Sequence, residues 1–314
     1  MNKLIIAILC LFINPSFARS GNFVFSVSGN KTFLNGKEFL VIGLRCSNAL
    51  ISDKTSSDLI GQLDLYKSYG VNTISVFFMG SRFGDVKGYK QDGSLDPVYA
   101  GRMAKIIEAC DERGMVVLAG CLYWSTTKAK WENWTQKEAD FAIANTVKWL
   151  SVNHYRNVFI DPDNEGMAHR EKGFDIGQMI AAGKEAGQEI MIGFNSSGPP
   201  PQNADLALHF SDKPADKPYI QSEGTPPEYW GEYSKEKDLY AYINVGIYTP
   251  GKIKKQLRDT DEHLMHGMGY IFASTWLQCV PPNTSPGGKG TPDDPGIKWW
   301  LKHIRMNYGS GKRN

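Results

Sequence analysis

The sequence lacks several motifs that would each point directly to a function. No segment after the N-terminus approaches the ~18 continuous apolar residues of a transmembrane helix, so we expect no membrane span. No Gly-x-Gly-x-x-Gly follows the first predicted strand, which argues against a dinucleotide cofactor. Gly-x-Ser-x-Gly, His-x-His and His-Glu-x-x-His are absent, which argues against a serine esterase of the α/β-hydrolase kind and against a metal hydrolase. We therefore expect neither a cofactor nor a bound metal.

Neither sign of charge dominates, and cysteine is scarce. The 35 Lys and Arg residues nearly balance the 33 Asp and Glu residues, and no basic stripe is present, so a nucleic-acid partner is not expected. Five cysteines are present. Apart from Cys10, they are Cys46, Cys110, Cys121 and Cys279, whose spacing matches no zinc motif. We interpret these four as mostly buried free thiols, although export would permit disulfides.

The first 18 residues have the pattern of a secretory signal. Lys3 supplies a positive start, residues 4–13 an apolar stretch, and Ser16-Phe17-Ala18 a cleavage site with small residues at its ends. We therefore predict a secreted or periplasmic protein, with a signal peptide at residues 1–18 and one domain at residues 19–314.

Short apolar runs alternate with helical patterns along most of the chain. Residues 23–41 predict an N-terminal β-hairpin, because Gly29-Asn30 and Asn35-Gly36 are strong turn signals. The predicted strands are residues 39–44, 72–78, 115–119, 158–160, 189–194, 205–208, 219–221 and 270–274, and the predicted helices are residues 57–69, 97–113, 136–155, 174–185, 251–266 and 296–308. Eight strands with crossovers favour an α/β fold of the closed (β/α)8 TIM-barrel type over an open sheet.

The same pattern also predicts the connection between two strands and the inward face of one helix. Only about ten residues, including three consecutive prolines, join the fifth and sixth strands, so a helix there must be short or absent. In the helix at residues 136–155, the apolar side chains of Phe141, Ile143, Val147 and Leu150 are expected to face inward.

Two glutamates directly follow buried strands. The fourth strand stops in Asp161-Pro162-Asp163-Asn164, residues that favour turns, and Glu165 comes next. Glu223 follows the seventh strand. The carboxyl ends of barrel strands meet at one mouth, where strands four and seven face each other. One carboxylic acid to protonate a leaving oxygen and one carboxylate to attack or activate water are what a glycosidase needs.

The alternative interpretations of these acids are structural. Glu165 at the start of a helix is also favoured by the helix dipole, and Glu223 also fits a solvated loop acid. Asp161 and Asp163 are expected to form the turn rather than to take part in catalysis.

Taken together, these residues resemble the clan of retaining glycoside hydrolases on a (β/α)8 barrel, which includes the family-5 cellulases and mannanases. In that clan an Asn-Glu pair ends strand four, a second Glu ends strand seven and a Trp ends strand eight. Asn164-Glu165, Glu223 and Trp276 stand at the matching places. The resemblance implies that Glu165 is the acid/base, that Glu223 is the nucleophile, and that a β-linked carbohydrate is the substrate.

Further candidate residues surround this pair. Asn164 is expected to donate to a sugar hydroxyl or to the nucleophile, and His209, after strand six, to orient a carboxylate, to contact substrate or to be purely structural. The aromatic residues Tyr123, Trp124 and Trp276 are candidates for a sugar-binding platform.

The chain also departs from the family-5 pattern. Family-5 enzymes usually carry an arginine at the end of strand two, but here none occurs until Arg82. Arg45, after strand one, either replaces it beside the nucleophile or forms a structural ion pair. Two other functions also remain open: an inactive barrel that binds polysaccharide, and a transglycosylase.

Overall fold

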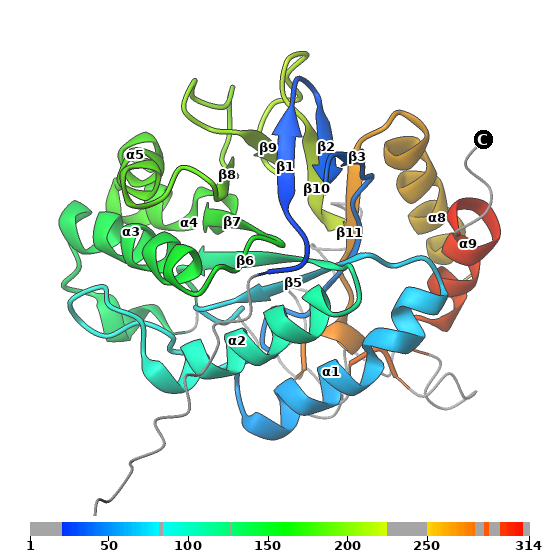
Figure 1. Ribbon diagram of the computed structural model, residues 1–314, viewed down its shortest axis with the longest axis horizontal. Coiled ribbons are helices and arrows are strands. Elements are labelled where there is room, and N and C mark those ends of the chain that lie inside the picture. The colour runs from blue at the N-terminus through cyan, green and yellow to red at the C-terminus, as the bar shows by residue number, and fades with distance from the viewer. Residues whose placement is uncertain are drawn as a thin grey trace, which may run out of the picture.

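The computed structural model describes residues 21–81, 84–125, 127–224, 250–279, 286–288 and 296–309. Eight parallel strands close into a barrel in the order β10-β11-β4-β5-β6-β7-β8-β9 (Figure 1). Their bounds are β4 Ile42–Arg45, β5 Thr73–Phe77, β6 Val116–Leu122, β7 Val158–Asp163, β8 Met191–Phe194, β9 Leu206–Leu208, β10 Tyr219–Gly224 and β11 Gly269–Phe272. This topology confirms the predicted (β/α)8 barrel.

Helices cover the outside of the barrel, in neighbouring pairs along three of its sides (Figure 1). They are α1 Asp53–Ser68, α2 Pro97–Asp111, α3 Gln136–Val152, α4 Met167–Lys172, α5 Ile176–Ala186, α8 Pro250–Met265 and α9 Lys298–Tyr308. All six predicted helices are present, and the structure has no helix between β8 and β9, as expected. Within the described ranges, no helix is both long and apolar enough to cross a lipid bilayer.

Two helical features were not predicted. Helix α1 begins at Asp53, four residues before the predicted start, because the Ser52 hydroxyl caps it by accepting a hydrogen bond from the Thr55 amide at 3.1 Å. Helix α4, Met167–Lys172, spans six residues, which is too short to show a periodic apolar stripe.

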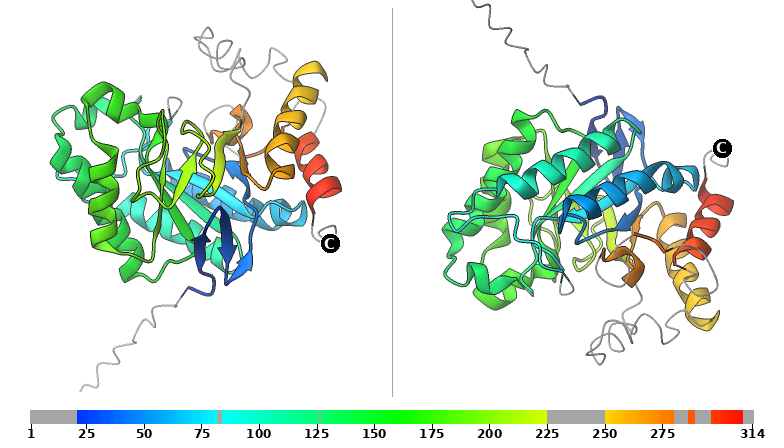
Figure 2. Two further views of the ribbon diagram at one scale, coloured as in Figure 1. Left: turned by 90° about the horizontal axis from the view of Figure 1, so that it is seen from above. Right: turned by 90° about the horizontal axis from the view of Figure 1, so that it is seen from below.

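An antiparallel sheet closes the N-terminal end of the barrel. It consists of β1 (Phe25–Ser28), β2 (Lys31–Leu34) and β3 (Lys37–Glu38), and it confirms the predicted hairpin (Figure 2). The Phe25 ring stacks on the Phe159 ring inside the barrel, with centroids 4.8 Å apart. The apolar core around them contains Val41, Val116, Leu118, Leu206, Leu208, Ile220 and Ile271. This end is therefore filled, and the opposite end is left for chemistry.

Glycines on the barrel strands leave room for large neighbouring side chains. A Cβ atom on Gly120 would lie 2.0 Å from the Phe77 ring, and one on Gly193 would lie 2.6 Å from the Leu208 side chain. The Phe77 ring therefore occupies the volume beside Gly120. The guanidinium of Arg45 lies over that ring, with Cζ 4.6 Å from the ring centroid.

Two sequence-based expectations are wrong. Strand β7 continues through Asp163 rather than turning after Ile160, because its pairing with β6 extends to Leu122 and Asp163. Asp161 and Asp163 are therefore buried strand residues.

Phe141 was expected to face inward but is 47% exposed. The other three predicted residues, Ile143, Val147 and Leu150, are buried as expected, and Ala139, Ala142 and Thr146 complete the inward stripe of α3. The prediction for the cysteines is confirmed, since Cys46, Cys110, Cys121 and Cys279 are all buried and free.

Candidate active site

A tight turn after β7 presents Glu165. Glu165 and Gly166 both lie in the left-handed backbone region, with φ of 54° and 62°. This conformation costs a non-glycine residue roughly 1–3 kcal/mol and persists only where the surroundings enforce it. Here the carboxylate of Asp163 accepts hydrogen bonds from the amides of Ala168 (3.0 Å) and His169 (2.8 Å), which fixes the start of α4. The turn is thus fixed by strand β7 before it and by the hydrogen bonds from the start of α4 to Asp163 after it.

Glu223 lies near the end of β10 and is bound by an arginine from β4. Its Oε2 atom lies 3.0 Å from Nη2 of Arg45, and both side chains are almost fully buried. Nη1 of Arg45 donates to the carbonyl oxygen of Ser222 at 3.1 Å. Burial opposes the charge on Arg45, but neighbouring acids, chiefly Glu223, outweigh it and raise the pKa of Arg45. Arg45 therefore supplies a permanent positive charge beside Glu223.

The two glutamates lie close together. One oxygen of Glu165, one oxygen of Glu223 and a ring nitrogen of His209 all lie within 4.8 Å of one another. Burial, followed by the negative charge of Glu223, raises the pKa of Glu165 to about 7. The two carboxyl groups are therefore close enough to act on one bond.

His209 follows β9 and faces Glu165. Its Nδ1 atom is hydrogen-bonded to Oε1 of Gln221. Because a carbonyl oxygen only accepts, Nδ1 carries the proton and Nε2 keeps its lone pair, which faces Oε1 of Glu165 at 3.8 Å. Burial lowers the pKa of His209, so the ring is neutral at pH 7.

The same cluster has ligand atoms that a divalent ion prefers. Within the described ranges, Glu165, His209 and Glu223 are the group with suitable spacing. The guanidinium of Arg45, however, already contacts Glu223 and compensates its charge. Because Glu223 is already paired with Arg45, we interpret these three residues as an arginine-bound carboxylate and its neighbours rather than as a metal site.

Asn164 contacts Arg45 rather than solvent. Its Oδ1 atom accepts a hydrogen bond from Nη2 of Arg45 at 2.8 Å, and the residue is fully buried. Asn195 lies beside it and was missed by the sequence analysis, although it directly follows β8 at the same mouth. The rule that strand ends carry functional side chains would have found it.

The candidate aromatic residues separate into different surroundings. Tyr123 lies with its ring 5.8 Å from Cζ of Arg45 and is 7% exposed. Trp124 is 2% exposed, packs against Trp134 and Phe174, and lines a separate pocket of about 260 Å³. Trp276 is 6% exposed and lies in the turn after β11, at the carboxyl end of the barrel strands.

The structure thus gathers six of the eight candidate residues around one point: Arg45, Tyr123, Asn164, Glu165, His209 and Glu223. Arg82 lies outside the described residues.

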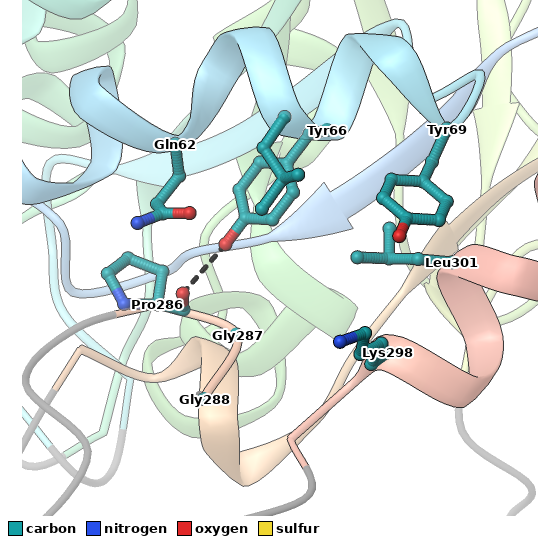
Figure 3. Close-up of a pocket in the computed structure, with 9 residues that line it drawn as sticks. Gln62, Tyr66, Tyr69, Pro286, Gly287, Gly288, Lys298 and Leu301 are labelled. Atoms are coloured by element: carbon teal, nitrogen blue, oxygen red, sulfur yellow. Dashed lines mark hydrogen bonds between the residues drawn. The ribbon is translucent and has the colours of Figure 1, made fainter. Parts of the chain in front are cut away.

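A smaller cavity of about 120 Å³ lies between α1 and α9 (Figure 3). The hydroxyl of Tyr66 donates to the carbonyl oxygen of Pro286 across it, at 2.7 Å. None of its lining residues belongs to the candidate site.

No family model matches this sequence, and no curated protein matches it. Solved structures do match. A glycoside hydrolase of family 5 from Bacteroides vulgatus is 13% identical with a TM-score of 0.57, over 82% of this chain and 63% of that one. A putative glycoside hydrolase of the same organism gives a TM-score of 0.61 at 13% identity, over 92% of this chain. The match covers only 61% of that second protein's own length.

Shorter proteins match over nearly their whole length. A β-glucanase of Saccharophagus degradans, solved in complex with cellotetraose, is 15% identical with a TM-score of 0.52, over 90% of this chain and 92% of that one. A β-mannanase of the blue mussel Mytilus edulis is 12% identical with a TM-score of 0.54, over 91% and 97%. At these identities the likeness establishes the fold, which is the barrel of the glycoside hydrolases that the sequence resembles.

Proposed function

We propose that this chain is a retaining glycoside hydrolase that cleaves O-glycosidic bonds of a β-linked poly- or oligosaccharide by double displacement. Glu165 is the acid/base and Glu223 is the nucleophile. The observation that carries the proposal is the close pair of carboxylates at the barrel mouth, one held by Arg45 and one with its pKa raised to about 7. The shared fold with glucanases and mannanases supports the same reaction class.

The first step uses the two different environments. Protonated Glu165 gives its proton to the leaving glycosidic oxygen, while an oxygen of Glu223 attacks the anomeric carbon. The leaving alcohol departs and a glycosyl ester remains on Glu223. Arg45 keeps the attacking carboxylate in place, because its guanidinium lies 3.0 Å away.

The second step follows from the same electrostatics. The negative charge of Glu223 raises the pKa of Glu165, and this charge is removed when Glu223 becomes an ester. The pKa of Glu165 then falls, so its carboxylate accepts a proton from an incoming water. That water attacks the anomeric carbon and releases the sugar, with the starting configuration retained.

The remaining candidates have different expected roles. His209 contacts the sugar cleaved at the mouth, whereas Asn164 and Arg45, which are buried, act on it through their contacts to each other and to Glu223. Tyr123 and Trp276 form the aromatic edge, and Trp124, which lines a separate pocket, is left out of the proposed subsite. Neither the sequence nor the site identifies which sugar is the substrate. We would test β-glucans and β-mannans first, because proteins of the same fold are named a β-glucanase and a β-1,4-D-mannanase.

We also infer that the protein is exported and that residues 19–314 form one barrel domain, because residues 1–18 have the pattern of a cleaved signal. N-terminal sequencing of protein recovered from the medium or the periplasm checks this. A new N-terminus at residue 19 is expected, and an intact N-terminus in the cytoplasm would contradict it.

The test of the proposed activity is hydrolysis of a panel of β-glycans by the purified protein, beside Glu165→Gln and Glu223→Gln. Loss of a general acid typically costs ~10²–10⁴-fold in rate, and we expect at least that loss in both variants. Glu262→Gln is the matched control, since Glu262 is an exposed residue of α8.

The outcomes separate the alternatives. Full activity in either active-site variant would remove that residue from the mechanism. A parent protein that binds a glycan without cutting it would indicate a binding barrel, and products longer than the substrate would indicate a transglycosylase.

A further inference from the structure

Asp161 is a buried carboxyl group that the two-step reaction does not use. It lies on β7 inside the barrel and is fully buried. Its Oδ2 atom accepts a hydrogen bond from Nδ2 of Asn195 at 2.7 Å. Its Oδ1 atom has no hydrogen-bond partner among the described residues. Burying a carboxyl group costs free energy of folding, so the presence of Asp161 inside the barrel calls for a structural or functional reason.

The amide of Asn195 is held at both ends. Nδ2 donates to Asp161, and Oδ1 accepts from the backbone amide of Phe210 at 3.2 Å. Rotating this amide by 180° would place an oxygen against the carboxyl group and an NH₂ group against a backbone N–H. Asp161 therefore fixes the direction in which the NH₂ group of Asn195 points.

That NH₂ group faces the candidate active site. Nδ2 of Asn195 lies 3.5 Å from Oδ1 of Asn164, the same oxygen that accepts from Nη2 of Arg45 at 2.8 Å. Nη2 of Arg45 in turn lies 3.0 Å from Oε2 of Glu223. A continuous line of polar contacts thus joins the buried Asp161 to the candidate nucleophile.

We propose that Asp161 is a positioning residue for Glu223, acting through the Asn195 amide, the Asn164 oxygen and the Arg45 guanidinium. This inference rests on the proposed function for its catalytic consequence, but its structural part stands alone. With the NH₂ group of Asn195 directed at it, Asn164 presents its oxygen to Arg45. Without that second donor, the Asn164 oxygen is held by Arg45 alone, so the Asn164 side chain and the guanidinium can shift together away from Glu223.

The charged groups around Asp161 come from three strands. Burial is the largest influence and opposes its ionised form, as does the charge of Asp163. The hydrogen bond from Asn195, the charge of Arg45 on β4 and a backbone hydrogen bond from Asp163 favour the ionised form. The thiol of Cys121 on β6 also lies close enough to interact electrostatically with Asp161. The balance raises the pKa of Asp161 to about 7. Either protonation state can accept from Asn195 through Oδ2, since a protonated carboxyl group keeps an acceptor oxygen.

The test compares Asp161→Ala with Asp111→Ala in the full-length protein. Asp111 is a matched control, because it is also buried and accepts hydrogen bonds from the amides of Asn22 (2.8 Å) and Phe23 (3.0 Å), near the opposite end of the barrel. Loss of an orienting partner typically costs about 10–100-fold in activity, and we expect this fall in kcat for Asp161→Ala with little change in KM. Asp111→Ala is expected to lower the Tm while leaving kcat unchanged.

Two further variants separate positioning from general destabilisation. Asp161→Asn keeps an oxygen that can accept from Asn195, so it should recover most of the lost kcat. Asn195→Ala should show the same defect as Asp161→Ala, and the double variant should be no worse than the poorer single variant, because both act along one line of contacts. Multiplied defects in the double variant, or a kcat for Asp161→Ala equal to that of Asp111→Ala, would overturn the inference.

A crystal structure of Asp161→Ala decides the structural part, whether or not a glycan substrate is found. We expect the Asn164 side chain to shift with the Arg45 guanidinium and the contact from Arg45 to Glu223 to lengthen beyond 3.0 Å. An unchanged contact from Arg45 to Glu223 would overturn the inference. Failure of the parent protein to cut any glycan would count against the proposed function alone.

Discussion

At the scale of single residues, the proposed reaction depends on two glutamates with different surroundings. The side chain of Glu223 is 3% exposed and faces the guanidinium of Arg45 at 3.0 Å. The side chain of Glu165 is 23% exposed, faces a neutral His209, and lies next to the negative charge of Glu223. Two identical side chains thus lie in different surroundings, which a reaction with one acid and one nucleophile requires.

The raised pKa of Glu165 sets the alkaline limb of the pH profile. The protonated form is the active form in the first step, so activity is present below the pKa and is lost as pH rises through about 7. We expect kcat/KM to fall about tenfold per pH unit above that point for a substrate with a poor leaving group. A substrate whose leaving group needs no proton should lose this limb. A limb that persists unchanged with such a substrate would contradict the role of Glu165.

Replacing Arg45 should lower the stability of the fold as well as the activity. Arg45→Met leaves Glu223 buried without its cation, and breaking a buried ion pair on one side typically costs about 3–5 kcal/mol. Arg45→Met combined with Glu223→Met should recover much of that loss, because no uncompensated charge remains. Chemical denaturation measures both.

The control for Arg45 is an exposed pair. Arg113 contacts Asp64 at 2.8 Å, and the Asp64 side chain is 77% exposed. Arg113→Met should change stability only slightly, because solvent screens surface ion pairs. An equal loss in Arg45→Met and Arg113→Met would contradict the importance of the buried pair.

At the scale of elements, alternation of strands and helices was sufficient to predict the barrel. The strand ends also placed Glu165 and Glu223 at one mouth, because that follows from parallel topology alone. The length of β7 was not predicted, since Asp-Pro-Asp favours a turn locally and only pairing with β6 extends the strand. The position of Arg45 beside Glu223 was one of two alternatives from the sequence, and the strand-end rule would also have pointed to Asn195. Which atoms make these contacts could not be predicted, because that depends on rotamers and register across strands far apart in sequence.

The glycine of β6 offers a test of how the elements support the site. A Cβ on Gly120 would meet the Phe77 ring at 2.0 Å, and that ring lies under Arg45. Gly120→Ala should destabilise the fold by about 1–3 kcal/mol and lower kcat, because the ring must shift. Gly61→Ala on α1 is the matched control: it has open space and should add about 0.5–1 kcal/mol of stability. Wild-type kcat in Gly120→Ala would contradict this support.

At the scale of the whole molecule, the buried acids link stability to pH. Burial raises the pKa values of Asp161 and Asp163 to about 7, from ordinary values near 4 in the unfolded chain. Their stabilising contribution is therefore fully present below pH about 4 and is lost as pH rises through about 7. Glu165 acts in the same direction, and His209, whose pKa is lowered, acts in the opposite direction.

Three acids against one histidine should give a higher Tm at pH 5 than at pH 8. Differential scanning calorimetry at constant ionic strength measures this difference. Asp161→Asn should reduce it, whereas Asp53→Asn should not, since Asp53 is exposed and its pKa is lowered by Arg102. A Tm that rises steadily from pH 5 to pH 8 would contradict the assignment of these buried carboxyl groups.

The most direct test of the account identifies the nucleophile itself. A 2-deoxy-2-fluoro glycoside with a good leaving group, made from the sugar that the panel identifies, allows the first step and slows the second, so the glycosyl ester accumulates. Digestion and mass spectrometry then locate the added sugar. The account predicts one labelled residue, Glu223, and no label in Glu223→Gln. A label on Glu165 or any other residue, or active protein that forms no ester, would contradict it.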